Sequence, residues 1–153
     1  MEVVNRSAKR DYEIVDTLDA GVVLFGSEAK SIRDGRVSLV GSFVKIRKGE
    51  AWLINMLVIK YAHGVEQKID ERRNRKLLLT AKQLKDWDLR SSSKGMAIVP
   101  LSIWSKKGLV KVRLGLGKGK REYEKREKIK KRDVERDMER ELRGKDKTIR
   151  VRK

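Results

Sequence analysis

Cysteine is absent from this chain of 153 residues, and histidine occurs once, at His63. The absence of cysteine excludes disulfides, thiolate zinc sites and cysteine nucleophiles, and a single histidine argues against a metal site or a histidine-based triad. A metal-dependent nuclease would have to use acids such as Asp16, Asp19, Glu28 and Asp34, but carboxylates near turns and helix starts more often cap helices or face water. We therefore expect a protein that is not an enzyme and has no catalytic residue, metal or cofactor.

Long apolar stretches are missing as well. Aromatic residues make up only 5% of the chain, so few side chains could stack on bases, and stacking is not expected to be the main mode of nucleic-acid recognition. No stretch approaches the roughly 18 apolar residues of a membrane-spanning helix, and no charged amino-terminal segment precedes an apolar run. These absences predict a cytoplasmic protein with no membrane partner.

Positive charge is what the chain has in excess. Forty Lys and Arg stand against 22 Asp and Glu, which gives a net charge of +18 and a pI near 10.3. Such a field attracts polyanions, and nucleic acid is the most common abundant one. An anionic membrane is the competing partner, but it would need an amphipathic helix with a bulky apolar face, which the basic carboxyl-terminal segment lacks. Composition therefore favours RNA recognition through phosphates, 2′-hydroxyls and shape.

Apolar and polar residues alternate with period two through residues 12–116, which predicts a mainly β domain. Turn sequences at 19–21, 48–50 and 106–108 indicate three hairpins. Short antiparallel strands without parallel crossovers favour a small closed barrel, because closure removes exposed strand edges. The six expected strands are 12–18, 22–25, 43–47, 51–57, 96–104 and 110–116.

Trp52 could serve the core or the surface. It shares one face of the 51–57 strand with Ile54 and Met56, so we expect that face to pack in the core. The alternative is an exposed aromatic side chain that stacks on an unpaired base, as in barrels that bind single strands.

Two short helices interrupt the strands. Ser27 is the expected N-cap of the first, which ends near Gly35, and Thr80 is the expected N-cap of the second. Trp87, in the second helix, should face the barrel together with Leu84. The polar and basic segment 63–76 is predicted to be a loop.

The composition changes at residue 118. Residues 118–153 hold 17 Lys and Arg against 9 Asp and Glu, so they carry +8 and the preceding residues carry +10. We therefore predict a barrel domain in residues 1–117 and a basic tail in residues 118–153. The tail has helical spacing, but the stripe of Val134, Met138 and Leu142 is too narrow to pack on a core. A polyanion is therefore its expected partner.

The stretch GLGKGKR matches neither of the common nucleotide-binding glycine motifs, and no strand-helix-strand unit surrounds it. Its bare backbone, beside Lys118, Lys120 and Arg121, could still approach an RNA phosphate closely. A flexible hinge after the last strand is the alternative.

Five segments in order resemble the family of the SsrA-binding protein, also called small protein B or SmpB. They cover residues 5–133 and read NRSAKRDYEI, GVVLFGSEAKSIRDGRVSL, GEAWLINM, RKLLL and VPLSIWSKKGLVKVRLGLGKGKREYEKREKIKKRD. Three positions depart from the family pattern: Arg10 replaces a histidine, Lys60 replaces a proline, and Glu124 replaces an aspartate. A generic OB-fold ribosomal or translation-initiation RNA-binding protein is the alternative that composition supports.

The resemblance implies a six-stranded OB-like barrel with short helices and no enzymatic activity. It implies binding to the tRNA-like domain of transfer-messenger RNA and delivery, with elongation factor Tu and alanyl-transfer-messenger RNA, to ribosomes stalled on broken messages. It also implies a monomer whose tail is disordered when free and helical in the decoding centre, near 16S rRNA, and in the empty mRNA channel.

Two sets of residues follow from the resemblance. Those assigned to RNA binding are Asn5, Arg6, Gly26, Glu28, Lys30, Ser31, Lys118, Gly119, Lys120 and Arg121. Those assigned to the ribosomal decoding centre are Tyr123, Lys125, Arg126, Lys130, Lys131 and Arg132.

Overall fold

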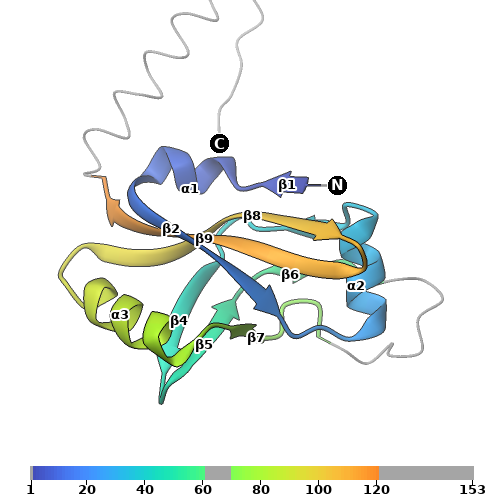
Figure 1. Ribbon diagram of the computed structural model, residues 1–153. Helices are drawn as coiled ribbons and strands as arrows, with labels where there is room; N and C mark the ends of the chain where they lie inside the picture. Colours follow the sequence, from blue (N-terminus) through green and yellow to red (C-terminus); the bar gives the residue numbers. More distant parts are fainter. Residues whose placement is uncertain (1, 61–69, 121–153) are drawn as a thin grey trace, which may run out of the picture. The chain divides into compact units, whose positions relative to one another are not determined.

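The computed structural model describes residues 2–60 and 70–120 (Figure 1). None of the helices in these two ranges is long and apolar enough to cross a membrane. The elements, in chain order, are β1 (Glu2–Val4), α1 (Arg6–Asp11), β2 (Tyr12–Val22), α2 (Gly26–Arg33), β3 (Val37–Ser38), β4 (Phe43–Arg47), β5 (Glu50–Ile54), β6 (Leu57–Val58), β7 (Arg75–Leu78), α3 (Ala81–Ser91), β8 (Met96–Lys106) and β9 (Leu109–Gly119).

Six antiparallel strands form a closed ring in the order β8, β4, β5, β7, β2 and β9, and β9 pairs again with β8. Strand β1 adds to β8 outside this ring, and β3 pairs separately with β6. The ring closes between β4 and β8 through one residue pair, Val44 with Ile98. The predicted small six-stranded barrel with short helices is therefore confirmed for the described part of the chain.

One of the six predicted strands is wrong: residues 22–25 do not form a separate strand, whereas the predicted strand 12–18 is the first part of β2. The expected turn at residues 19–21 is absent, because these residues pair with residues 111–113 of β9 and β2 continues to Val22. An Asp-Ala-Gly sequence signals a turn only where no partner strand continues the hydrogen-bonded ladder. The sixth strand of the ring is β7, which begins at Arg75 inside the segment that was predicted to be a loop.

The two other predicted hairpins are confirmed, and their turns explain why. Lys48 and Gly49, between β4 and β5, have φ values of 51° and 74°, and Lys107 and Gly108, between β8 and β9, have values of 51° and 78°. Two successive positive φ values match the twist of antiparallel strands, and glycine adopts them at low cost. Strand β9 then continues to Gly119, beyond the predicted strand end at residue 116.

The core face of β5 is opposite to the predicted one. Ala51 and Leu53 are fully buried, whereas Trp52 is half-buried on the outer face and lies outside the core cluster. Met56 is fully buried because Asn55 adopts a left-handed conformation, with φ of 68°, that ends the strand and resets the alternation. The expectation that Trp52 packs in the core is therefore wrong.

Of the two predicted N-cap residues, Thr80 is confirmed and Ser27 is wrong. Helix α3 follows the N-cap Thr80, whose hydroxyl accepts from the Gln83 N–H at 3.1 Å, and Trp87 is buried in the core as expected. Helix α2 instead takes Phe25 as its N-cap, not Ser27. The backbone N–H of Phe25 donates to Glu28 Oε1 at 3.0 Å, so a glutamate in the first turn supplies the cap contact.

An ion cluster of Glu28, Arg73 and Arg75 fastens α2 to the barrel. Glu28 is only 5% exposed and Arg75 is fully buried. Arg75 Nε and Nη2 donate to Glu28 Oε2 at 2.9 and 2.6 Å, and Arg73 donates to both carboxylate oxygens. The other Arg75 N–H groups donate to the carbonyl oxygens of Met56, Arg73 and Glu71. Every donor of the buried guanidinium therefore has an acceptor.

Charge is retained inside this cluster. Burial alone would raise the pKa of Glu28, but hydrogen bonds from Arg73, the Phe25 N–H and Arg75 together hold that pKa below its ordinary value. A guanidinium stays protonated at any ordinary pH. The paired charges stabilise the junction only as long as both are present, because an unpaired buried charge is costly.

We predict that Glu28→Gln lowers the free energy of unfolding at pH 7 by about 3 to 5 kcal/mol, because it leaves the buried Arg75 without a counter-charge. The pKa of Glu28 is lower in the folded state. Its contribution is therefore complete above about pH 4.3 and is lost as the pH falls through the folded pKa. Urea unfolding at pH 7 and pH 3 should show a smaller difference between wild type and variant at pH 3.

The control is Glu50→Gln, which removes the surface partner of Lys76. Because both side chains are more than 40% exposed, this change should cost less than about 1 kcal/mol. A Glu28→Gln protein as stable as the Glu50→Gln protein at pH 7 would contradict the role given to the cluster.

We also predict that Gly117→Ala destabilises the barrel by about 1 to 3 kcal/mol. A Cβ atom at Gly117 would lie 2.9 Å from the Tyr12 Cβ and 3.1 Å from Ile14 Cδ1, so β2 would have to move. Gly26→Ala is the control, since a Cβ there meets no atom within 4 Å. Equal urea midpoints for the two variants would rule out a close β2 and β9 contact.

Candidate nucleic-acid interface

Strand β9 carries three exposed basic side chains along its length, which we call the basic row. Lys111, Arg113 and Lys118 are exposed, whereas the alternate residues Val112 and Leu114 are fully buried. Lys111 and Arg113 follow from the alternation that the sequence displays, although neither is among the predicted RNA-binding residues. Lys118 has the parity of the buried Leu114 and Leu116, so it lies on the other face of β9, where it is exposed at the end of the strand. An inner face that packs in the core fixes the backbone from which these cations project.

The cations of this row differ in their surroundings. Arg113 Nε donates to Asp19 Oδ1 at 3.0 Å, and its guanidinium lies 5.2 Å from the centre of the Trp104 ring. Lys111 and Lys118 form no ion pair with any residue in the described ranges. The row therefore combines one oriented guanidinium with two lysines available to an anionic partner.

The predicted Lys-Gly-Lys segment lies at the carboxyl end of β9. Lys118 stands opposite Glu13 of β2, and the N–H of Gly119 donates to the Gly95 carbonyl oxygen at 2.9 Å. Lys118 and Gly119 are exposed, and Lys120 is partly exposed. Lys118 and Gly119 thus belong to a barrel strand and have a defined backbone, from which a phosphate could be approached.

The predicted residues on α2 divide into two kinds. Gly26 and Lys30 are exposed, so they present surface to a partner. Glu28 and Ser31 are buried, Glu28 within its ion cluster and Ser31 with no exposed area. In this structure Glu28 therefore positions α2, and the surface at this end of the barrel comes from its neighbours.

Arg73 also contributes to the surface beside α2. Its guanidinium lies 4.5 Å from the centre of the Phe25 ring, and the Phe25 side chain is 46% exposed. The sequence suggested a loop at Arg73, and nothing in its local pattern pointed to a partner on α2.

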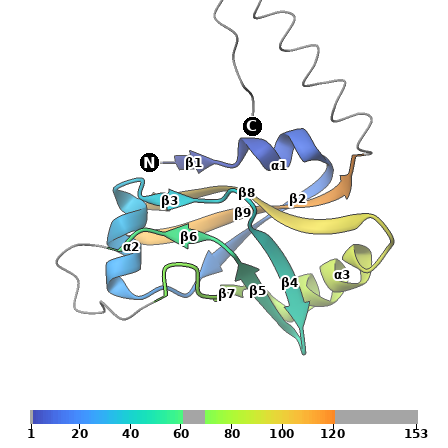
Figure 2. The same ribbon diagram turned by 180° about the vertical axis from the view of Figure 1, so that it is seen from behind.

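The two predicted clusters do not meet. Figures 1 and 2, which view the molecule from opposite sides, both place α2 at one end of the barrel and the carboxyl end of β9 at the other. The basic row of β9 runs along the strand that joins these ends. An interface that uses both clusters must therefore be elongated.

Asn5 and Arg6 lie at the start of α1, a helix that was not predicted. Asn5 is buried, its Nδ2 donates to the carbonyl oxygens of Pro100 at 2.9 Å and Leu39 at 3.3 Å, and its Oδ1 accepts from the Ala8 N–H. Asn5 therefore caps the helix and ties it to the barrel. Arg6 is exposed and faces solvent.

The remaining predicted residues lie outside the described ranges. Arg121 is the last of the predicted RNA-binding set. The decoding-centre set comprises Tyr123, Lys125, Arg126, Lys130, Lys131 and Arg132.

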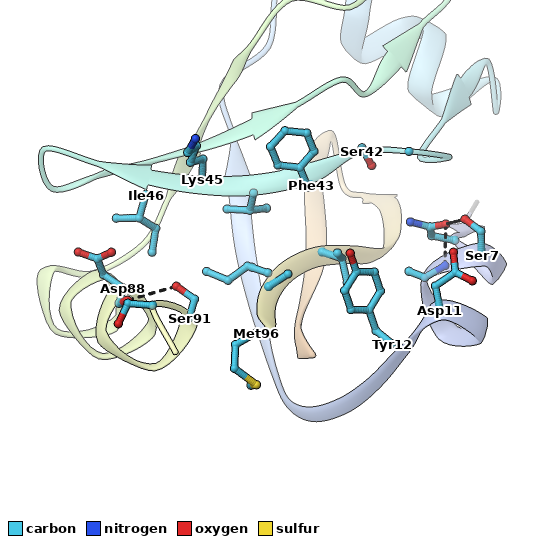
Figure 3. Close-up of a pocket in the computed structure, with 18 residues that line it drawn as sticks. Ser7, Asp11, Tyr12, Ser42, Phe43, Lys45, Ile46, Asp88, Ser91 and Met96 are labelled. Atoms are coloured by element: carbon cyan, nitrogen blue, oxygen red, sulfur yellow. Dashed lines mark hydrogen bonds between the residues drawn. The ribbon is translucent and has the colours of Figure 1, made fainter. Parts of the chain in front are cut away.

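A groove of about 480 Å³ runs between α1, α3, β4 and β8 (Figure 3). Tyr12, Ile46 and Met96 give it apolar walls, and the carboxylates of Asp11 and Asp88 lie near its two ends. Carboxylates repel phosphate. This groove is therefore poorly suited to RNA and does not extend the basic interface.

Three of the four acids considered for a nuclease site, Asp16, Asp19 and Glu28, have structural partners. Asp16 accepts from Arg90 at 2.7 Å, and the hydrogen bonds from Arg90 and from the Thr17 N–H lower the pKa of Asp16. Asp19 is engaged by Arg113, and Glu28 lies in the buried cluster. No three His, Cys, Asp or Glu residues gather as metal ligands in the part of the chain that the structure describes.

Comparison with known proteins agrees with the fold. The SmpB protein family model matches residues 2–144. The SsrA-binding protein of Streptococcus suis is 46% identical over 140 residues, which cover 92% of this chain and 90% of that protein. The SsrA-binding protein of Streptococcus thermophilus strain LMD-9 is 46% identical over 136 residues, 89% of this chain and 88% of that protein.

A solved structure described as "tmRNA-SmpB: a journey to the center of the bacterial ribosome" superposes with a TM-score of 0.69. Its sequence is 40% identical, and the match covers 84% of this chain and 94% of that one. This chain therefore resembles that protein in both its sequence and its fold. Because the family model spans nearly the whole chain and the relatives match about nine tenths of it, this chain belongs to the SmpB family.

Proposed function

We propose that this protein binds the tRNA-like domain of transfer-messenger RNA and delivers it to stalled ribosomes for trans-translation. The observation that carries the proposal is the basic row of β9, at whose end Lys118 and Gly119 are exposed. The relatives of this chain are named SsrA-binding protein, which supports an RNA partner for this surface. The similar solved structure is described as a complex with transfer-messenger RNA at the ribosome.

The geometry of the row suits a folded RNA. Lys111, Arg113 and Lys118 supply point charges and one planar donor group along a rigid strand, and such groups bind phosphates without regard to sequence. Strand β9 has 11 residues and so extends over about 35 Å, which is long compared with a single base. A double-stranded element, which is read by its shape, backbone and 2′-hydroxyls, fits this length.

The two ends of the row add local contacts. At Gly119 an added Cβ would come no closer than 3.7 Å to its nearest neighbour, so the uncovered backbone leaves room for a phosphate. At the other end, the exposed backbone of Gly26 and the exposed Lys30 side chain belong to a helix that the Glu28 cluster holds in place. The interface we propose therefore spans the barrel from α2 to the end of β9.

The proposal assigns residues 121–153 to the ribosome. These residues hold 15 Lys and Arg against 9 Asp and Glu, and their net charge of +6 supports a polyanionic partner. We place them in the decoding centre and the empty mRNA channel, next to 16S rRNA. Elongation factor Tu with alanyl-transfer-messenger RNA completes the delivery complex. In this scheme the protein acts in the cytoplasm as a monomer without enzymatic activity.

We predict that Lys111→Ala and Lys118→Ala each weaken binding to the tRNA-like domain and reduce the slope of log affinity against log salt by about 1. Filter binding between 50 and 200 mM salt measures both quantities. The control is Lys107→Ala, in the turn before β9, which should change the slope less. A slope unaffected by both row variants would reject the row as a phosphate-binding surface.

The choice of RNA separates this function from that of a generic OB-fold RNA-binding protein. Transfer-messenger RNA should bind more tightly than tRNA, and tRNA more tightly than an unrelated hairpin. Equal affinity for the three RNAs would support the generic module, and cleavage of any of them in magnesium would support a nuclease.

We also predict that truncation after Lys120 leaves affinity for the tRNA-like domain nearly unchanged and abolishes the tagging of stalled peptides. The cut preserves all of β9, which ends at Gly119. Circular dichroism provides the folding control. Full tagging by the truncated protein would contradict the assignment of residues 121–153 to the ribosome.

A further inference from the structure

The outer face of β4, β5 and β7 carries an aromatic side chain between two lysines. Trp52 of β5 stands directly opposite Lys45 of β4 and directly opposite Lys76 of β7. Lys45 and Trp52, together with Arg47, Ile54 and Asn74, line a surface cavity of about 320 Å³. This cavity lies on strands that contribute nothing to the basic row of β9.

Core packing does not account for Trp52. The inner face of β5 is supplied by Ala51 and Leu53, which are fully buried, and Trp52 remains half-buried. In Figure 3, Lys45 projects from the face of β4 opposite to Ile46, which points into the groove. The Trp52 cavity and the groove with its carboxylates therefore lie on opposite faces of β4.

The charges around the indole are not balanced. Lys76 Nζ is paired with Glu50 Oε2 at 2.8 Å. Lys45 and Arg47, on the other side of Trp52, form no ion pair with any residue described in the structure. The side-chain amide of Asn74 likewise has no hydrogen-bond partner among them. Within the described residues the cavity thus holds a half-buried indole, two cations that form no ion pair and one amide with no hydrogen-bond partner, although Glu50 stands opposite Arg47.

We propose that Trp52, Lys45, Arg47 and Asn74 form a second RNA site that takes one unpaired base. The base stacks on the indole, Lys45 and Arg47 bind the phosphates that flank it, and the Asn74 amide donates to or accepts from the base edge. An acidic peptide would engage the cations but would leave the indole surface and the amide without matched partners. The inference goes beyond the proposed function, which places the tRNA-like domain on β9.

Tryptophan fluorescence tests the site directly. A single-stranded hexanucleotide of adenylates should quench the emission of the full-length protein, and a blunt RNA duplex of the same length should quench it less. The measurement uses a Trp104→Phe background, which removes the indole beside Arg113 of the basic row. In that background Trp52→Phe should remove the quenching, whereas Trp87→Phe, in the core, should preserve it. Quenching that survives Trp52→Phe, or that a hexaglutamate peptide produces equally, would overturn the proposal.

Affinity for the hexanucleotide provides a second measurement. Trp52→Ala should weaken binding about tenfold, and Trp52→Phe should restore most of it, because a phenyl ring still stacks. The Lys45→Ala, Arg47→Ala double variant should bind more weakly than a Lys106→Ala, Lys107→Ala double variant, which removes the same charge from the β8 and β9 turn. An equal loss of affinity in the two double variants would show that net charge alone causes the effect, and it would contradict the proposed site.

The source of the base is transfer-messenger RNA or ribosomal RNA, and chemical footprinting on each RNA tells them apart. Protection of an unpaired base that is lost with Trp52→Ala identifies the source, and the absence of such protection in both RNAs overturns the proposal. Affinity for the isolated tRNA-like domain should be unchanged in Trp52→Ala. If the β9 variants bound the tRNA-like domain normally, the proposed function would be contradicted but the Trp52 site would not. If Trp52→Ala bound the hexanucleotide normally, the Trp52 site would be contradicted but the proposed function would not.

Discussion

The pairing of Glu28 with the buried Arg75 is the interaction on which the arrangement of the barrel depends. It joins the first turn of α2 to the first residue of β7, and Arg75 also donates to the carbonyl oxygen of Met56, just after the end of β5. A charged pair with every donor satisfied is directional in a way that apolar contacts are not. It therefore sets where α2 lies on the ring, and with it the position of Gly26 and Lys30.

Two strands combine a buried face that packs in the core with an exposed face that can bind a partner. On β9, buried aliphatic residues fix a strand whose alternate positions carry lysine and arginine, and on β5 buried Ala51 and Leu53 fix a strand that exposes Trp52. In both places the core determines a regular backbone, and the pleat turns that regularity into a spaced set of outward groups. The first set suits phosphates, and the second combines charge with a stacking surface.

Sequence patterns predicted the features that depend on near neighbours. The hairpins at Lys48-Gly49 and Lys107-Gly108 and the cap at Thr80 were predictable because a few adjacent residues determine them. Arg75 could not be recognised as a core residue, since its burial depends on Glu28, 47 positions away. Trp52 was misassigned because the positive φ of Asn55 shifts the alternation by one residue. The RNA contacts of the predicted residues remain predictions, although the structure places Lys118 and Gly119 at the surface.

The ring closes between β4 and β8 through the single pair of Val44 and Ile98, whereas β9 pairs with β2 and β8 along almost its whole length. Local opening follows the weakest ladder, so we expect amide hydrogens beside this seam to exchange through small fluctuations and those of β9 to exchange through nearly global unfolding. Transient opening of the barrel thus leaves β2, β9 and β8 together as one cooperative unit. The basic row is carried by the part of the sheet that is last to lose its order.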